Sequence, residues 1–363
     1  MDQGHVDRTI ASVVIPTYNG SRTIHLPLRG LASQEGLSGV FEVIVVDNAS
    51  TDDISAVVEA DPSTRRLRER GHSVRIVREG RQGLTHARIR GCLEAQAEPV
   101  CCLDDDTIPV PGYIAAAVAG FTDPQVGVLI SRVFPVYEVP PRQALARREH
   151  LLAINRRMGD RQIAWSAGPM LVPTLGAGLW FRREAFLRAV PMDHPERLLT
   201  DRIGGKLVSG GDIEIGYLIG QAGYTRVYLP ELQLEHHIPR ARLRLGYALR
   251  LIQGIVRSEL TLRARYGTPE SGWMRWLQAT SGVILSPLAC LRPDPWGEVA
   301  MVAAARLALW RGPYLLPPAP VTVPGAVGTR VEVDRGGSAD EACGNALARV
   351  RPSRNGPTVD RVG

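Results

Sequence analysis

The chain has 363 residues, 44% of them hydrophobic and 22% charged, which is ordinary for a globular protein with one large domain plus an appendage, or with two domains. The formal net charge is +6, but Lys206 is the only lysine and no block of basic residues is interleaved with aromatic ones, so we expect no nucleic-acid partner. No secretory signal opens the chain, no stretch reaches the ~18 apolar residues of a membrane span, and the five cysteines have no paired spacing. We therefore expect a cytoplasmic protein.

The first half of the chain alternates strand and helix patterns. Apolar runs at 11–15, 42–46, 73–77 and 99–103 predict strands, and helical patterns occupy 22–33, the stretch leading up to 60, and 83–96. Continuous apolar strands separated by helices predict an α/β fold, with a mostly parallel sheet covered by helices on both faces.

Polar residues follow three of these strands at their carboxyl ends: Pro16, Thr17, Tyr18 and Asn19; Asp47 and Asn48; and Asp104, Asp105 and Asp106. Ligands bind at this edge of such sheets. Three adjacent carboxylates repel one another and cost stability unless a cation neutralises them, although Asp clusters also cap helices and fill turns. The convergence of three polar segments favours a ligand site over a turn.

Beyond about residue 242 the pattern becomes helical, first over 243–266 and then in two apolar segments, 277–291 and 299–309. Both segments are too short or too polar to span a membrane, so we expect buried or interfacial helices. From about residue 317 the composition shifts to Pro, Gly, Ala, Val, Ser and Arg with little periodicity, which predicts a disordered tail.

Seven segments follow one another in a characteristic order: VVIPTYNG, EVIVVDNASTDD, GLTHARIRG, CCLDDDTIP, GAGLWFRREAF, SGGDIEIGYLIGQAGY and LPELQLEHHIPRARL. This series resembles the family 2 glycosyltransferases over about residues 9 to 245, and its late part resembles bacterial exopolysaccharide enzymes of the hormogonium polysaccharide type. The resemblance implies a GT-A catalytic domain over 9–245, a helical extension over 246–316 and the tail over 317–363. It also implies inverting, metal-dependent transfer of one sugar from a nucleotide-sugar donor to a saccharide or lipid-linked acceptor.

The resemblance assigns the acidic triplet to a metal and a diphosphate. Asp104 and Asp106 match the two acidic positions of the family's DxD pattern, and Asp105 fills the variable middle position. Carboxylate oxygens suit Mg²⁺ or Mn²⁺, and a divalent ion stabilises the negative charge of a departing diphosphate. The implied ligands are Asp106, with Asp104 holding the ribose or a metal-bound water, and His236 as a third ligand; His237 is the weaker candidate.

The same resemblance assigns the nucleotide contacts. It places Pro16, Thr17, Tyr18 and Asn19 along the base, Asp47 as acceptor for the base N–H with Asn48 beside it, and Arg88 near a phosphate or Asp104. UDP is the usual donor nucleotide, but these residues do not separate it from GDP or dTDP. Two alternatives stay open: Asp47 as a helix N-cap, and Arg88 on a solvated helix face.

Inverting transfer needs a general base that takes the proton from the acceptor hydroxyl. The family places this base in an E-D motif, where this chain has Gly211 and Asp212. Asp212 is the expected base, with a helix N-cap as the alternative. The missing Glu leaves an acceptor contact without its usual residue, and Glu214 is a nearby carboxylate.

Other readings of the sequence remain open. A nucleotidyltransferase would need a Gly-rich loop with a basic residue, which PTYNGS does not offer; a degenerate sugar-nucleotide-binding module has the missing Glu as its only support. Natural-product glycosylation is as open as polysaccharide assembly. Gly272 replaces the Gln of the Q-x-x-R-W motif of processive synthases, so we expect single-sugar transfer. A further hypothesis is that the helical extension makes peripheral contact with the inner face of the membrane.

Overall fold

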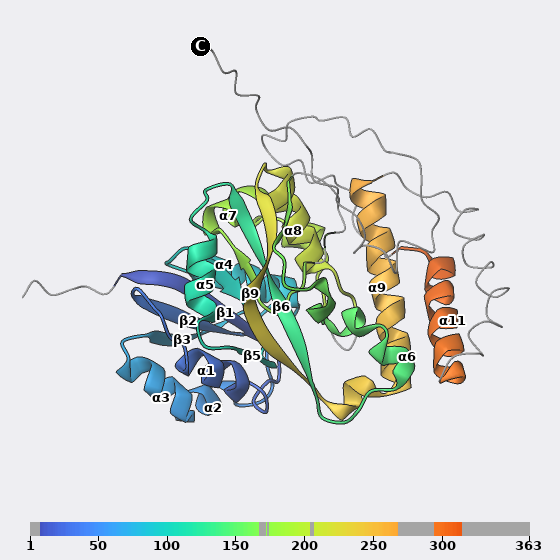
Figure 1. Cartoon of the computed structure of the whole chain (residues 1–363), viewed down its shortest axis with the longest axis horizontal. Helices are drawn as coiled ribbons and strands as arrows, with labels where there is room; N and C mark the ends of the chain where they lie inside the picture. Colours follow the sequence, from blue (N-terminus) through green and yellow to red (C-terminus); the bar gives the residue numbers. More distant parts are fainter. Residues whose placement is uncertain (1–7, 167–171, 173, 204–206, 268–293, 314–363) are drawn as a thin grey trace, which may run out of the picture. The chain divides into compact units, whose positions relative to one another are not determined.

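A computed structural model describes residues 8–166, 172, 174–203, 207–267 and 294–313. Within these residues one sheet has nine strands in the order β3-β2-β1-β4-β8-β6-β9-β5, with β7 paired to β9 (Figure 1). The strands are β1 (Thr9–Thr17), β2 (Val40–Asp47), β3 (Ser73–Arg78), β4 (Val100–Cys102), β5 (Thr107–Pro109), β6 (Val126–Tyr137), β7 (Ile163–Trp165), β8 (Leu179–Phe181) and β9 (Thr225–Ile238).

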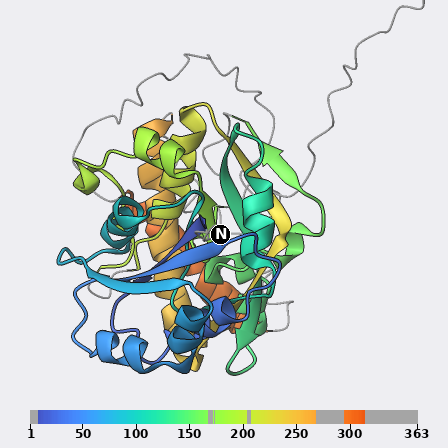
Figure 2. The same ribbon diagram turned by 90° about the vertical axis from the view of Figure 1, so that its left-hand side faces the viewer.

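The four strands predicted from the apolar runs are confirmed, and they pair in parallel, with β1 between β2 and β4. The register sets Thr17 opposite Asp47 and Val14 opposite Cys102, so the carboxyl ends of β1, β2 and β4 lie side by side. The amino-terminal strands of this sheet, in blue, lie together in Figures 1 and 2. The polar segments that follow these strands therefore start from one edge of the sheet, as the sequence predicts.

The later strands make the sheet mixed. β6 and β9 pair in parallel with each other, whereas β8 runs antiparallel to both β4 and β6, and β5 and β7 run antiparallel to β9. β5, β7 and β8 have three residues each, too short to show a periodicity in the sequence.

Helices cover both faces of the sheet. On one face α1 (His25–Ala32), α3 (Pro62–Glu69) and α5 (Tyr113–Gly120) contribute to one apolar cluster; on the other face α4 (Leu84–Glu94), α7 (Arg183–Ala189) and α8 (Gly211–Gln221) contribute to a second. Neighbouring strand residues alternate between the two clusters: Val13 belongs to the first and Val14 to the second, and Cys101 and Cys102 divide in the same way. The predicted double-sided cover is confirmed.

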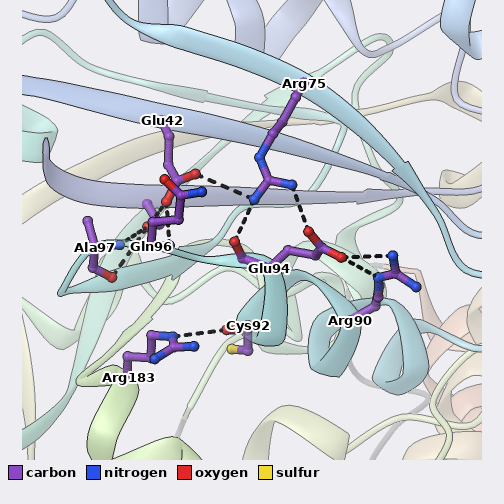
Figure 3. Close-up of polar contacts among 9 residues, drawn as sticks. Glu42, Arg75, Arg90, Cys92, Glu94, Gln96, Ala97 and Arg183 are labelled. Carbon is purple, nitrogen blue, oxygen red and sulfur yellow. Dashed lines mark hydrogen bonds and ion pairs between the residues drawn. The ribbon is translucent and has the colours of Figure 1, made fainter.

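The carboxyl-terminal end of α4 is fixed to the sheet by a polar cluster (Figure 3). Arg75 on β3 lies between Glu94 of α4, at 2.8 Å, and the buried Glu42 of β2, at 3.6 Å. Glu42 also accepts a hydrogen bond of 2.6 Å from the backbone N–H of Gln96. The cluster holds the carboxyl-terminal end of α4 in place. The amino-terminal turns of α4 reach the edge of the sheet at which the parallel strands end.

The helical pattern over 243–266 forms α9 (Leu245–Tyr266), and the segment 299–309 lies within α11 (Pro295–Arg311). α11 contacts α9 and the short helix α6 (Gln143–Ala146). Among the helices that the structure describes, none combines the length and apolar character needed to cross a bilayer. The apolar segment 277–291 and the tail 317–363 lie outside the described residues.

Candidate active site

The acidic triplet follows β4 directly, and β9 brings His236 to it. The short strand β5 begins at Thr107, one residue after the triplet, and pairs Thr107 with His236. The backbone N–H of His237 also donates to the backbone carbonyl of Asp106, at 2.9 Å. Residues 130 positions apart in the sequence are therefore held together by backbone pairing, because β5 is an extension of the triplet itself.

Asp106 is buried and contacts two nitrogen-bearing side chains. Its Oδ1 lies 3.4 Å from Nε2 of His236, and its Oδ2 lies 2.8 Å from Nη1 of Arg242. Burial opposes ionisation of Asp106, but His236 and Arg242 outweigh burial and lower the pKa of this carboxyl. Arg242 was not predicted as a site residue, although it stands in the quoted segment HHIPRARL.

The donor set around Asp106 fits a divalent cation. Nδ1 of His236 is buried and has no hydrogen-bond partner among the described residues, and a carboxylate with an imidazole suits Mn²⁺. The described part of the chain contains no group of three or more His, Cys, Asp or Glu side chains placed around one metal position. Sites that bind a metal with a substrate diphosphate often use only one or two carboxylates, so the protein ligands would be Asp106 and His236, with Asp104 beside them.

Asp105 contacts the loop after β1. Its Oδ2 accepts a hydrogen bond of 2.6 Å from Oγ1 of Thr17, and a side chain at Gly20 would collide with both groups. Burial, followed by the negative charge of Asp106, raises the pKa of Asp105 to about 7. The predicted nucleotide-binding residues Thr17 and Asp105 thus contact each other, and Asp105 fixes the loop that carries Tyr18 and Asn19.

The loops after β1 and β2 are joined by hydrogen bonds. Oδ1 of Asn19 accepts from the backbone N–H of Thr51 at 2.8 Å, and the backbone N–H of Asn19 donates to Oγ of Ser50 at 3.0 Å. Within the loop after β2, Oδ1 of Asp47 accepts from the backbone N–H of Ser50 at 2.8 Å. Asp53, not Asp47, is the N-cap of α2 (Ile54–Ala60), so the N-cap alternative for Asp47 is wrong. Tyr18 next to Asn19 is 48% exposed, which leaves its ring accessible to a ligand.

Asn48 is buried, and its side chain holds the loop between β3 and α4. Its Nδ2 donates to the backbone carbonyl of Arg81 at 2.7 Å, and its Oδ1 accepts from the backbone N–H of Gly83 at 2.7 Å. These bonds use both ends of the amide. Asn48 therefore supports the start of α4.

Arg88 on α4 is buried, so the alternative of a solvated helix face is wrong. Its Nη1 forms an ion pair of 2.7 Å with Oδ2 of Asp201. Burial disfavours the guanidinium charge, but Asp201, Asp212 and Asp104 together raise the pKa of Arg88. Gly176 of the segment GAGLW makes room for this side chain, because a Cβ there would overlap Nη2 of Arg88.

Asp212 lies in the first turn of α8 and is half-buried. Its carboxylate accepts from the backbone N–H of Gly176 at 2.7 Å and from that of Ile213 at 2.9 Å. Gly210 is the N-cap of this helix, so the N-cap alternative for Asp212 is wrong. Burial and then the charge of Asp201 raise the pKa of Asp212 to about 6.

Glu214 does not replace the missing glutamate. It is fully buried and accepts hydrogen bonds of 2.6 Å from both the backbone N–H of Leu199 and Nη1 of Arg265. Both carboxylate oxygens are therefore occupied by hydrogen bonds that connect α8 to α9 and to the loop before α8.

Comparison with known proteins decides the family. The model of glycosyl transferase family 2 matches residues 12–187, and that of glycosyl transferase family group 2 matches residues 100–317. The chain belongs to the family 2 glycosyltransferases. The mannosyltransferase PcManGT from Pyrobaculum calidifontis is similar in structure to this glycosyltransferase, with a TM-score of 0.55 and 20% identity over 84% of this chain and 86% of that one. This likeness confirms the GT-A fold.

Two further proteins are similar over different extents. Residues 1–349 of S. aureus TarS match 83% of this glycosyltransferase and 90% of that chain, with 15% identity and a TM-score of 0.47. An uncharacterized protein of Mycobacterium tuberculosis, MT1568, is 34% identical over 124 residues, which are 33% of this chain. The alignment spans about a third (35%) of that relative's length.

Proposed function

We propose that this glycosyltransferase is an inverting, divalent-cation-dependent enzyme. It moves one sugar from a nucleotide-diphosphate sugar, with UDP as the expected nucleotide, to a hydroxyl of a saccharide or lipid-linked acceptor in polysaccharide or glycoconjugate assembly. Natural-product glycosylation is the alternative pathway. In support, PcManGT is described in complex with GDP-Man and Mn²⁺, a nucleotide-diphosphate sugar and a divalent cation.

The observation that carries the proposal is the placement of two kinds of carboxylate at one edge of the sheet. Asp106, with a lowered pKa, lies against His236, whereas Asp212, with a pKa raised to about 6, acts on Arg88, as Asp104 also does. Carboxyl groups in environments that push their pKa values apart are typical of sites where one group stays ionised and another transfers a proton.

Asp106 and His236, with Asp104 beside them, are the residues that would hold the cation. When bound, a divalent ion supplies Lewis-acid stabilisation of the charge on the diphosphate leaving group. Arg242 now neutralises Asp106, so it is placed to keep the buried carboxylate charged before a ligand arrives. Its guanidinium also offers N–H donors suited to phosphate oxygens.

Asp212 is the proposed general base. Because its pKa is about 6, it is mostly ionised at neutral pH and still basic enough to accept a proton from an attacking hydroxyl. The N–H groups of Gly176 and Ile213 fix the direction of its carboxylate. Transfer by direct attack of the acceptor inverts the configuration at the anomeric carbon.

The nucleotide would lie along the loops after β1 and β2. Pro16, Thr17 and the exposed Tyr18 are proposed to line the base, with Asp47 accepting from its N–H. The hydrogen bonds between Asn19 and residues 50–51 support the proposal, because they hold together the two loops that carry Tyr18 and Asp47.

The test is release of nucleoside diphosphate from a panel of UDP-, GDP- and dTDP-sugars with Mn²⁺. We expect release from one donor class, lost in Asp212→Asn protein while the nucleoside diphosphate still binds. The degenerate-module reading predicts binding without release in the unchanged protein, and a nucleotidyltransferase would release pyrophosphate from a nucleoside triphosphate and a sugar phosphate.

A further inference from the structure

The missing glutamate of the E-D motif leaves a specific question: what fills the space beside Gly211? A Cβ at Gly211 would lie 2.7 Å from Oδ2 of Asp201 and 2.9 Å from its Cγ. The carboxyl group of Asp201 therefore occupies the space that a side chain at 211 would enter. Gly211 is required here because Asp201 and a larger residue cannot share this space.

Both oxygens of Asp201 are used. Oδ1 accepts a hydrogen bond of 2.7 Å from the backbone N–H of Gly211, the first residue of α8, and Oδ2 pairs with Nη1 of Arg88 at 2.7 Å. Asp201 is buried, at 3% exposure, so it cannot meet an acceptor directly. Its carboxylate joins α4 to the start of the helix that carries Asp212.

The backbone at Asp201 supports this placement. Its φ is 54°, in the left-handed region that non-glycine residues adopt at a cost, and Asp is among the residues that tolerate it best. The preceding residues are held to α4 by the hydroxyl of Thr85, which donates to the carbonyl of Leu199 at 2.5 Å. A strained, buried residue with a fully used carboxylate beside a catalytic helix is typical of a positioning group.

We propose that Asp201 places, from the loop before α8, a carboxylate in the space beside position 211, where this family carries a Glu side chain, and that this carboxylate positions Arg88 and Asp212 for transfer without contacting the acceptor. The inference rests on the proposed function of Asp212. The charged groups that face Asp212 are Arg88 from α4 and Asp201 from the loop, with backbone N–H groups from Gly176 and Ile213 completing its surroundings.

The first arm of the test is a pH profile of donor turnover in Asp201→Asn protein, with Mn²⁺ and the best donor of the panel. Asn keeps the shape of Asp201 but removes the charge that disfavours ionisation of Asp212, so the acid limb should move to lower pH by roughly one unit. We expect turnover at neutral pH to fall about 100-fold, because Arg88 and α8 lose their common partner.

Glu214→Gln is the matched control. Glu214 is also a buried carboxylate on this side of the molecule, paired with an arginine and with a loop N–H, but its oxygens point toward Leu199 and Arg265. This variant should lose thermal stability and keep its acid limb. An acid limb in Asp201→Asn that stays in place, with losses equal to those of Glu214→Gln, would overturn the positioning role.

The second arm moves the carboxylate and does not depend on activity. Oγ1 of Thr85 also lies 2.7 Å from the position of a Cβ at 211, so Thr85→Ala protein serves as the reference. In the Thr85→Ala background, Asp201→Gly should lower the melting temperature, and Gly211→Glu should lower it by steric overlap with Asp201. The protein that carries both Asp201→Gly and Gly211→Glu should regain most of the lost melting temperature. Additive losses would show that the two positions do not share one carboxylate site. If the unchanged protein turns over no donor, the proposed function fails. The melting temperatures of these variants still show whether the carboxylate of Asp201 occupies the space beside position 211.

Discussion

Burial and the neighbouring Asp201 raise the pKa of Asp212 to about 6, which sets a pH dependence at the scale of a single residue. Below this pKa the carboxyl is protonated and cannot accept the proton of an attacking hydroxyl; above it the base is available. We predict that kcat/KM falls as the pH falls through about 6 and is level at neutral pH. Asp212→Asn should lower kcat by roughly 10²- to 10⁴-fold with little change in donor KM.

The measurement is a pH series of nucleoside diphosphate release. Activity that stays constant from pH 7 to well below the pKa, or an Asn variant with normal kcat, would assign the base to another residue. If the Asn variant lost both activity and donor binding, Asp212 would instead be needed to keep the donor site folded.

His236 and His237 are neighbours with opposite expected roles. Nε2 of His236 faces Asp106 at 3.4 Å, whereas Nε2 of His237 lies 3.9 Å from Glu235, on the other side of β9. We predict that His236→Ala raises the Mn²⁺ concentration needed for half-maximal turnover about 10-fold or more, and that His237→Ala leaves it unchanged. A Mn²⁺ titration of both variants checks this. Equal effects would remove His236 from the ligand set.

At the scale of an element, α11 presents an exposed apolar stripe. Trp296 is 81% exposed and Trp310 is 70% exposed, and Leu307 between them is 39% exposed. Spacings of 11 and 3 residues place these side chains on one side of the helix. Trp is typical of membrane interfaces, so peripheral membrane contact through this helix stays a prediction.

Vesicle co-sedimentation tests it. Trp296→Ser/Trp310→Ser protein should lose binding to phosphatidylglycerol-containing vesicles, and Leu93→Ser is the control, because Leu93 is 52% exposed on α4, away from α11. Unchanged sedimentation of the double variant, or no binding by the unchanged protein, would contradict the prediction.

At the scale of the whole molecule, the sequence predicted the parallel half of the fold and the position of Asp104, Asp105 and Asp106 at the carboxyl-end edge of the sheet. β1, β2 and β4 are largely buried apolar runs, β3 is a shorter and half-buried strand beside them, and their carboxyl ends fall together because parallel strands share an edge. The antiparallel strands β5, β7 and β8 were not predicted, because three residues give no period, whereas β4 is as short but was recognised from the apolar run at 99–103. Their pairing nevertheless brings His236 to Asp106.

The residues that sequence reasoning missed are those whose roles arise only from tertiary contact. Asp201 stands 113 positions from Arg88 in a loop without a motif, and no local pattern marks it. Arg242 was visible within a quoted segment, but its pairing with Asp106 depends on how the chain turns after β9. The absent Glu at Gly211 was visible in the sequence, but there it indicated only a missing acceptor contact and did not point to Asp201.

The account depends on one electrostatic claim, that Asp106 and its neighbours hold a divalent ion together with a nucleoside diphosphate. The most direct measurement is the melting temperature of the protein with UDP or GDP, in Mn²⁺ and after chelation, for the unchanged chain and for Asp106→Ala. We predict that the nucleotide raises the melting temperature only with Mn²⁺ and only in the unchanged chain, because ligand binding stabilises the folded state. An equal rise in chelator, or an equal rise in Asp106→Ala, would contradict the claim.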